Sequence, residues 1–88
     1  MNTTRPRIAL DAMARKAGCR LGTIGDIERL AGIDTNNNAE RKALWDQFRH
    51  LYRAPSQDLI NAVMDHCSKI AIRRIKAGKL SLIRTCHY

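Results

Sequence analysis

The sequence predicts an all-α protein: a single small four-helix domain over residues 1–88 with a short extended C-terminal tail. Apolar residues recur at spacings of three and four along most of the chain, which is the periodicity of amphipathic helices. Glycine and proline fall between these segments, where helices end and begin. The chain has 88 residues. Because a domain of this length buries only about 60 to 65% of its unfolded surface, a deep enclosed cleft is not expected and an enzyme is disfavoured.

A first helix is predicted over about residues 5–17. Pro6 suits its first turn, and Thr3 or Thr4 is able to cap it. Gly18 ends it. Between these limits the apolar residues at helical spacing are Ile8, Ala9, Ala12 and Met13.

A second, shorter helix is predicted over about residues 23–31, with Thr23 as its cap and Gly32 as its stop. One face of this helix is apolar and carries Ile24, Ile27, Leu30 and Ala31.

A third helix is predicted over about residues 38–53. Asp34 and the asparagines 36–38 supply the turn and cap chemistry before it, and Pro55 follows its end. Its apolar stripe, with three of the four aromatic residues, is the predicted hydrophobic centre of the fold: Leu44, Trp45, Phe48, Leu51 and Tyr52.

The longest helix is predicted over about residues 56–77, capped by Ser56 and ended by Gly78. Its apolar stripe comprises Leu59, Ile60, Val63, Met64, Cys67, Ile70 and Ala71. Ile72 falls off this stripe, because residues two apart lie about 200° apart on a helix, so some apolar surface is left for a second copy of the chain to cover. A homodimer is therefore expected. The tail, residues 79–88, alternates weakly and is compatible with an edge strand paired to its copy.

The net charge of +8 is concentrated at the two ends of the chain. Residues 1–20 carry five bases and one acid, and residues 66–88 carry six bases and no acid. The middle, residues 21–65, carries five bases and seven acids. Clustered positive charge is typical of proteins that meet a polyanion, so the expected partner is double-stranded DNA or an acidic protein surface.

The spacing of small, glycine and apolar residues in the segment 14–27 indicates two helices that pack closely across a turn. Ala14 is small where two helices would cross, and Gly18 follows four residues later, where a turn needs positive φ. Apolar residues then follow at positions suited to the underside of a second helix: Cys19, Ile24 and Ile27. Residues 10–29 thus resemble the helix-turn-helix of lac-repressor-type and phage-repressor-type regulators, which implies a DNA-binding domain with residues 23–29 in a major groove.

Two alternatives to this register stay open. Phosphates repel Asp26 and Glu28, which fall in the helix that would face the groove. Residues 23–42 also resemble the opening of a lac-repressor-type motif, which would make the reading surface Asn36, Asn37, Asn38, Arg41 and Lys42. Asparagine suits this role because its amide pairs with adenine N6 and N7. The third interpretation is a chance match in a helical interaction module.

The basic ends are expected to position DNA rather than to read it. Arg5 and Arg7 form an arm suited to a minor groove or a phosphate row, and the basic residues near position 75 follow a backbone. The predicted nucleic-acid-binding residues are Arg5, Arg7, Arg15, Lys16, Arg20, Thr23, Asn36, Asn37, Arg41, Lys42, Arg73, Arg74, Lys76 and Lys79.

No catalytic residue, cofactor or metal site is predicted. The pairs His66-Cys67 and Cys86-His87 lack the spacing of zinc ligands, and Cys67 on the apolar stripe is a core residue. Three widely spaced cysteines indicate no disulfide framework, which fits a reducing compartment, and the sequence has neither a secretory signal nor a membrane span. A cytoplasmic protein is expected.

The leading prediction is a small basic DNA-binding protein of regulatory or accessory type that uses a helix-turn-helix and basic termini. The alternative is a helical adaptor or inhibitor that docks its basic surface on another protein, one that itself handles nucleic acid being a candidate. This alternative is less affected by the two acids in residues 23–29.

Overall fold

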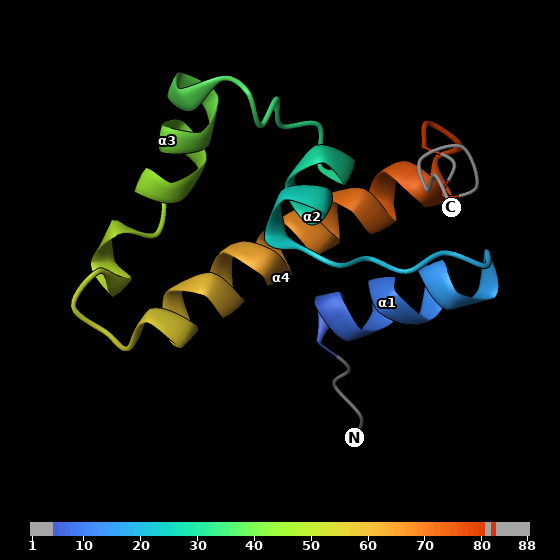
Figure 1. Ribbon diagram of the computed structural model, residues 1–88, viewed down its shortest axis with the longest axis horizontal. Helices are drawn as coiled ribbons and strands as arrows, with labels where there is room; N and C mark the ends of the chain where they lie inside the picture. Colours follow the sequence, from blue (N-terminus) through green and yellow to red (C-terminus); the bar gives the residue numbers. More distant parts are fainter. Residues whose placement is uncertain (1–4, 81, 83–88) are drawn as a thin grey trace.

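The computed structural model describes residues 5–80 and 82 of the chain (Figure 1). That part of the chain is all-α and contains no strand. Its elements are α1 (Pro6–Lys16), α2 (Ile24–Leu30), α3 (Asn38–Asp46), the short 3-10 helix η1 (Arg49–Leu51) and α4 (Ser56–Lys76). The predicted fold class is confirmed, and the first, second and fourth helices end within one residue of their predicted limits. Most of the predicted tail, 79–88, lies outside the described residues.

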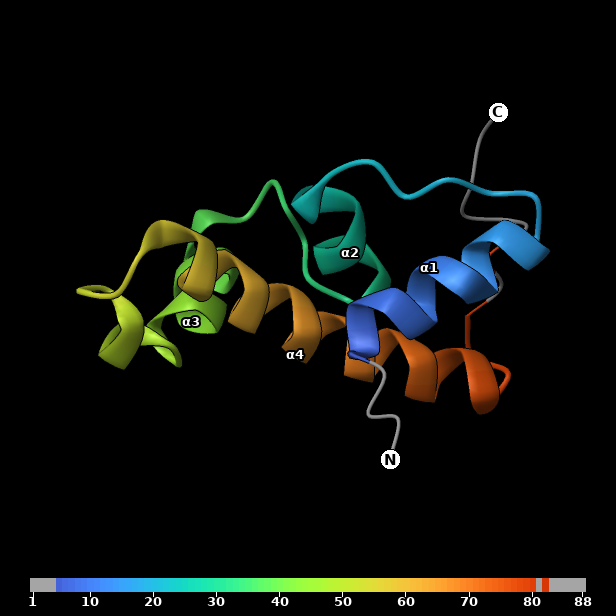
Figure 2. The ribbon, with the colours of Figure 1, turned by 90° about the horizontal axis from the view of Figure 1, so that it is seen from below.

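Helices α1 and α4 run side by side in the same direction, and α2 also packs against α4 (Figures 1 and 2). The N-terminal end of α1 is fixed to the middle of α4, where Arg5 pairs with Asp65. Helix α3 and η1 lie at the other end of the molecule, beside the start of α4 (Figures 1 and 2). The C-terminal ends of α1 and α4 therefore come to the same end of the molecule.

The core lies where α1, α2 and α4 meet. Its innermost apolar side chains are at most 1% exposed: Leu10, Ala14, Ile27, Leu30, Val63, Cys67 and Ala71. This corrects the prediction that residues 44–52 form the hydrophobic centre. Trp45 and Phe48 pack only at the edge of the core, and Tyr52 is 52% exposed. Ile72, predicted to lie off the apolar stripe, is partly buried and packs against the same core.

Local signals explain where α2 begins and ends. The Thr23 hydroxyl accepts a hydrogen bond from the backbone N–H of Asp26, and the Asp26 carboxylate accepts one from the N–H of Thr23. This reciprocal arrangement is a capping box, and it confirms Thr23 as the cap. Gly32 follows the helix with φ +91°, a conformation that side chains with a Cβ rarely adopt.

The described residues at the starts of α1 and α4 differ from the predicted caps. Arg5, not a threonine, precedes the first turn of α1 and offers no side-chain cap; Thr3 and Thr4 lie outside the described residues. Ser56 is the first helical residue of α4, and Pro55 stands at the cap position without a side-chain bond. Both helices instead begin at a proline-fixed turn.

The predicted third helix, 38–53, breaks after Asp46. Phe48 leaves the helical conformation with φ −110° and ψ 19°. Its ring then meets the ring of His66 on α4 edge to face, with centroids 5.4 Å apart. A continuous helix would not allow this conformation at Phe48. The helix therefore ends, and the chain continues as η1 before it reverses into α4.

Candidate nucleic-acid interface

Helix α2, the groove-reading element of the first register, is mostly buried. Ile27, Glu28 and Leu30 are each at most 1% exposed, and among its seven residues only Arg29 is exposed. The connection from α1 spans residues 17–23, longer than the three- to four-residue turn typical of a helix-turn-helix. Helix α2 thus offers little side-chain surface to a DNA groove.

The two acids of α2 both have partners within the chain. The Glu28 carboxylate is fully buried and accepts two hydrogen bonds from Arg41, at 3.1 Å from Nε and 3.0 Å from Nη2. The indole N–H of Trp45 donates to the same carboxylate over 3.4 Å. This cluster of Glu28, Arg41 and Trp45 ties α3 to α2, and a buried carboxylate of this kind requires such partners.

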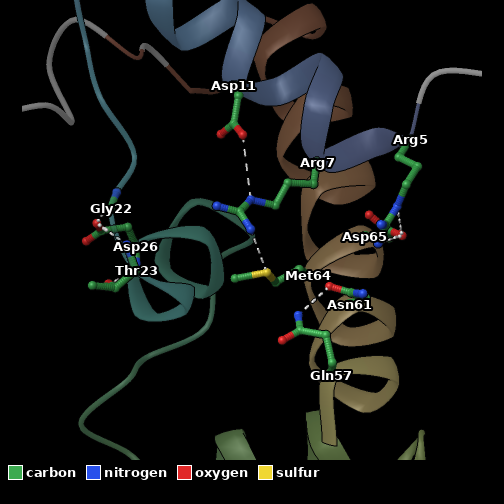
Figure 3. Close-up of polar contacts among 10 residues, drawn as sticks. All are labelled: Arg5, Arg7, Asp11, Gly22, Thr23, Asp26, Gln57, Asn61, Met64 and Asp65. Carbon is green, nitrogen blue, oxygen red and sulfur yellow. Dashed lines mark hydrogen bonds and ion pairs between the residues drawn. The ribbon is translucent and has the colours of Figure 1, made fainter. Parts of the chain in front are cut away.

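Asp26 acts in the cap of α2 rather than at its surface (Figure 3). Its Oδ2 accepts the backbone N–H groups of Gly22 and Thr23, each at 3.2 Å, and Arg29 donates to its Oδ1. Partial burial alone would raise the pKa of Asp26, but the two N–H groups and the Arg29 guanidinium outweigh it and hold the pKa below its ordinary value. The phosphate repulsion that counts against the first register is therefore reduced at both acids.

The predicted N-terminal arm is held against α4 (Figure 3). Arg5 binds the Oδ2 of Asp65 through Nε at 3.2 Å and Nη2 at 3.0 Å. Arg7 donates to the Met64 sulfur over 3.0 Å, and its Nε lies 3.7 Å from the Asp11 carboxylate. Both arginines of the predicted arm therefore have partners within the chain, although the Arg5 side chain stays 49% exposed.

Four further predicted residues also act within the fold. Thr23 caps α2, and the Asn37 side chain caps α3 by accepting the N–H groups of Ala39 and Glu40. Arg41 serves Glu28, as described. The guanidinium of Arg74 donates to the Leu30 carbonyl over 2.8 Å at the C-terminal end of α2. The remaining predicted residues are exposed: Arg15, Lys16, Arg20, Asn36, Lys42, Arg73, Lys76 and Lys79.

Six of these exposed residues gather at one end of the molecule, which we call the basic end: Arg15, Lys16, Arg20, Arg73, Lys76 and Lys79. They come from the last turns of α1 and α4 and from the residues just after them. Both helices finish on the right in Figures 1 and 2. No acid occurs in residues 12–25 or 66–88 of the sequence. Two charge clusters that are far apart in the sequence thus share one end.

The structure also shows a cationic site that the sequence does not predict. An open pocket of about 600 Å³ lies at the α3 end of the molecule. Its lining is Lys42, Asp46, Arg49, His50, Tyr52 and Arg53. The signal that could have found it is the interleaving of basic residues with an aromatic in the segment 49–53, which helical spacing alone places at the rim of a core. We call this the α3 pocket.

The remaining chemistry of the described residues is sparse. No group of three or more His, Cys, Asp or Glu residues among them could hold a metal ion, and no helix among them is long and apolar enough to cross a membrane. Burial, with a smaller effect from the charge of Glu28, raises the pKa of Cys67 to about 11, which fits its predicted place in the core. Cys19 is disulfide-bonded, which the wide spacing of the three cysteines does not indicate.

Comparison with known proteins adds no assignment: no family model, curated protein or solved structure matches this chain.

Proposed function

We propose that this protein is a binding protein of regulatory or accessory type that contacts the phosphates of double-stranded DNA with its basic end. The observation that carries the proposal is the parallel course of α1 and α4, which puts the two basic segments of the chain together (Figure 2). The last turn of α1 holds Arg15 and Lys16, and that of α4 holds Arg73 and Lys76. Exposed cations at this density release counterions from a duplex on binding, which favours association at low salt.

Phosphate contact rather than base reading is the proposed mode. Helix α2 exposes a single residue, Arg29, and that side chain pairs with Asp26. Base readout needs several donors aimed into a groove. Of the second register's reading surface, Asn36, Asn37, Asn38 and Lys42 are exposed, but the Asn37 side chain caps α3 and Arg41 binds Glu28. Sequence preference is therefore expected to be weak, and any preference is expected to depend on Asn36 and Asn38.

A salt titration of duplex binding tests the proposal. Fluorescence anisotropy with a labelled duplex of about 20 base pairs is measured from about 50 to 200 mM salt for the wild type and for Arg73→Gln/Lys76→Gln. The double variant is expected to bind several-fold more weakly on every duplex sequence. Its plot of log affinity against log salt is expected to be less steep, with the magnitude of the negative slope lower by about 2. This is about one unit for each phosphate that is no longer neutralised.

The matched control removes two exposed arginines at the other end of the molecule, Arg49→Gln/Arg53→Gln, and is expected to leave the duplex slope within about 0.5 of the wild type. Absence of duplex binding by the wild type at about 50 mM salt would refute the proposal. Equal losses in both double variants would refute the assignment to the basic end. Exchange of Asn36 and Asn38 for Ala separates the modes, because it changes base preference only if α3 reads bases.

The adaptor alternative and the homodimer are distinguished in parallel experiments. A tagged protein captures partners from a lysate with and without nuclease treatment. Partners lost on nuclease treatment support the nucleic-acid proposal, and partners retained by the wild type but not by Arg73→Gln/Lys76→Gln support an acidic protein surface. Sedimentation of the purified protein measures the homodimer directly. The cytoplasmic location stays a prediction.

A further inference from the structure

The α3 pocket contains three cationic side chains that form no ion pair within the described part of the chain. Lys42 and the two arginines, Arg49 and Arg53, are exposed, and none of the three pairs with a carboxylate among the described residues. The single acid in the lining is Asp46, and its Oδ1 accepts the Tyr52 hydroxyl at 3.2 Å. Three cations therefore surround a space of about 600 Å³ with one carboxylate between them. Clustered like charge of this kind favours an anionic ligand.

Tyr52 gives the pocket an aromatic face. Among the described residues, Tyr52 is one of two large hydrophobic residues that are more than half exposed, the other being Ile8 on α1. The hydrogen bond from the hydroxyl to Asp46 restricts the orientation of the ring, and the residue stays 52% exposed. Partial desolvation, the hydrogen bond and the charge of Asp46 raise the pKa of Tyr52, so the phenol is neutral near pH 7. A neutral, oriented and exposed ring is suited to stacking.

Anion recognition and ring recognition together define the class of ligand. Inorganic phosphate would contact the cations but would make no stacking contact with the Tyr52 ring. A base inside a duplex is already stacked on its neighbours, so it has no free face for Tyr52. A nucleotide with an unpaired base carries both a phosphate and a free π-face, and guanidinium groups recognise phosphate in a bidentate fashion. A pocket of about 600 Å³ lies in the usual size range of small-ligand sites.

We propose that the α3 pocket is a second binding site, separate from the basic end, that takes a nucleotide with an unpaired base. The base stacks on Tyr52, and the phosphate is bound by Arg49 and Arg53 with Lys42 beside them. The shared chemistry has two sources, a free mononucleotide or a unit of a single-stranded nucleic acid. Neither involves a duplex, so this site and the proposed DNA contact can fail independently.

The test measures binding of a labelled single strand of eight thymidines, with adenosine monophosphate and inorganic phosphate as competitors. Tyr52→Leu keeps an apolar side chain but removes the ring and is expected to weaken strand binding by about 5- to 100-fold. Tyr52→Phe loses only the bond to Asp46 and is expected to stay within about threefold of the wild type. Arg49→Gln/Arg53→Gln is expected to weaken binding at least about tenfold and to lower the salt slope by about 1.4.

The matched control is Lys69→Gln, which removes an exposed cation of α4 that belongs to neither the α3 pocket nor the basic end, and it is expected to keep single-strand binding within about threefold. Tyr52 is exposed, so circular dichroism of both Tyr52 variants is expected to match the wild type. Displacement by the mononucleotide at similar affinity identifies a free nucleotide as sufficient, and much tighter binding of the strand identifies single-stranded nucleic acid. Three results would overturn the proposal: undiminished binding by Tyr52→Leu, equal competition by inorganic phosphate, or loss of strand binding in Arg73→Gln/Lys76→Gln with none in the variants of the α3 pocket.

Discussion

Helices α2 and α3 are both short, with seven and nine residues, and both are candidate reading helices in the sequence, yet they are held in place by different forces. Helix α2 buries Ile27, Glu28 and Leu30 against the rest of the fold. Helix α3 buries only Leu44. Helix α3 is also connected to α2 by hydrogen bonds that Arg41 and the indole N–H of Trp45 donate to the Glu28 carboxylate. Helix α2 is thus part of the core, whereas α3 is attached to it.

The difference shows how a helix that fits a recognition motif can serve another purpose. Apolar residues at the positions a helix-turn-helix uses for its internal packing also suit a helix that packs on α4. What distinguishes the two uses is the surface that remains, and α2 exposes one residue while α3 exposes most of its polar side chains. Ligand contact is expected where side chains remain available, which is at the α3 pocket and the basic end.

The largest expected effect comes from shortening a core side chain of α2. Ile27→Ala removes a fully buried side chain and is expected to lower the free energy of unfolding by about 3 kcal/mol, through lost transfer energy and the cavity left behind. Chemical denaturation followed by circular dichroism measures it. Ile8→Ala is the matched control, because Ile8 is 56% exposed, and it is expected to cost less than about 0.5 kcal/mol. Equal costs would contradict a core centred on α1, α2 and α4.

Next in size is the loss of the charge that ties α3 to α2. Glu28→Gln keeps the shape of the side chain but leaves Arg41 without its carboxylate, and is expected to cost about 1 to 3 kcal/mol. The cost is limited because the Arg41 side chain is 39% exposed and is able to gain water. Trp45 fluorescence is expected to change, since the indole N–H loses a charged acceptor.

Glu40→Gln provides the control for this charge, since Glu40 is exposed on α3 and accepts only the backbone N–H of Asp34 among the described residues. Its expected cost is below about 1 kcal/mol. A double-mutant cycle of Glu28→Gln with Arg41→Gln isolates the pair, with an expected coupling of at least about 1 kcal/mol. A coupling near zero would mean that α3 is held by something other than this pair.

Periodicity and stop signals could predict much of the fold. Apolar spacing located all four helices, and Thr23 and Gly32 marked the limits of α2. The break after Asp46 could not be predicted, because no glycine or proline stands there and the cause is a contact of Phe48 with α4. Local sequence does not contain a contact with a residue 18 positions away, His66.

Residue type alone could not sort the candidate site. A basic side chain that serves as an internal partner looks the same in the sequence as one that is exposed. Arg74 and Arg73 are neighbours, yet Arg74 donates to the Leu30 carbonyl and Arg73 is exposed. Sequence also misplaced Tyr52. Its helical spacing from Phe48 suggests a core position, but α3 ends before Phe48, and Tyr52 is exposed. The basic end needed the parallel course of α1 and α4, which no local pattern specifies.

Removing one cap from each helix sharpens the comparison further. Thr23→Ala and Asn37→Ala each remove a side-chain acceptor at a helix start and are each expected to cost about 1 kcal/mol of helix stability. Because α2 belongs to the core, Thr23→Ala is expected to lower the free energy of global unfolding. The loss at Asn37 is expected as faster amide hydrogen exchange confined to α3, by about fivefold, with little change in global stability. Uniform faster exchange in both variants would contradict the difference in attachment.

The smallest expected effect is the pH dependence contributed by Asp26. Its pKa is lowered in the folded protein, so its contribution to stability is present above the unfolded value of about 3.9 and is lost as the pH falls through the folded value. The wild type is therefore expected to exceed Asp26→Asn in unfolding free energy near pH 6, and the difference is expected to vanish as the pH falls well below about 4. Since the side chain is 34% exposed, solvent screening limits the difference to less than about 1 kcal/mol.

Asp58→Asn, which removes an exposed carboxylate in the first turn of α4, provides the control in the same series of urea titrations. A difference between wild type and Asp26→Asn that grew toward low pH would mean that the cap of α2 draws no stability from the Asp26 charge.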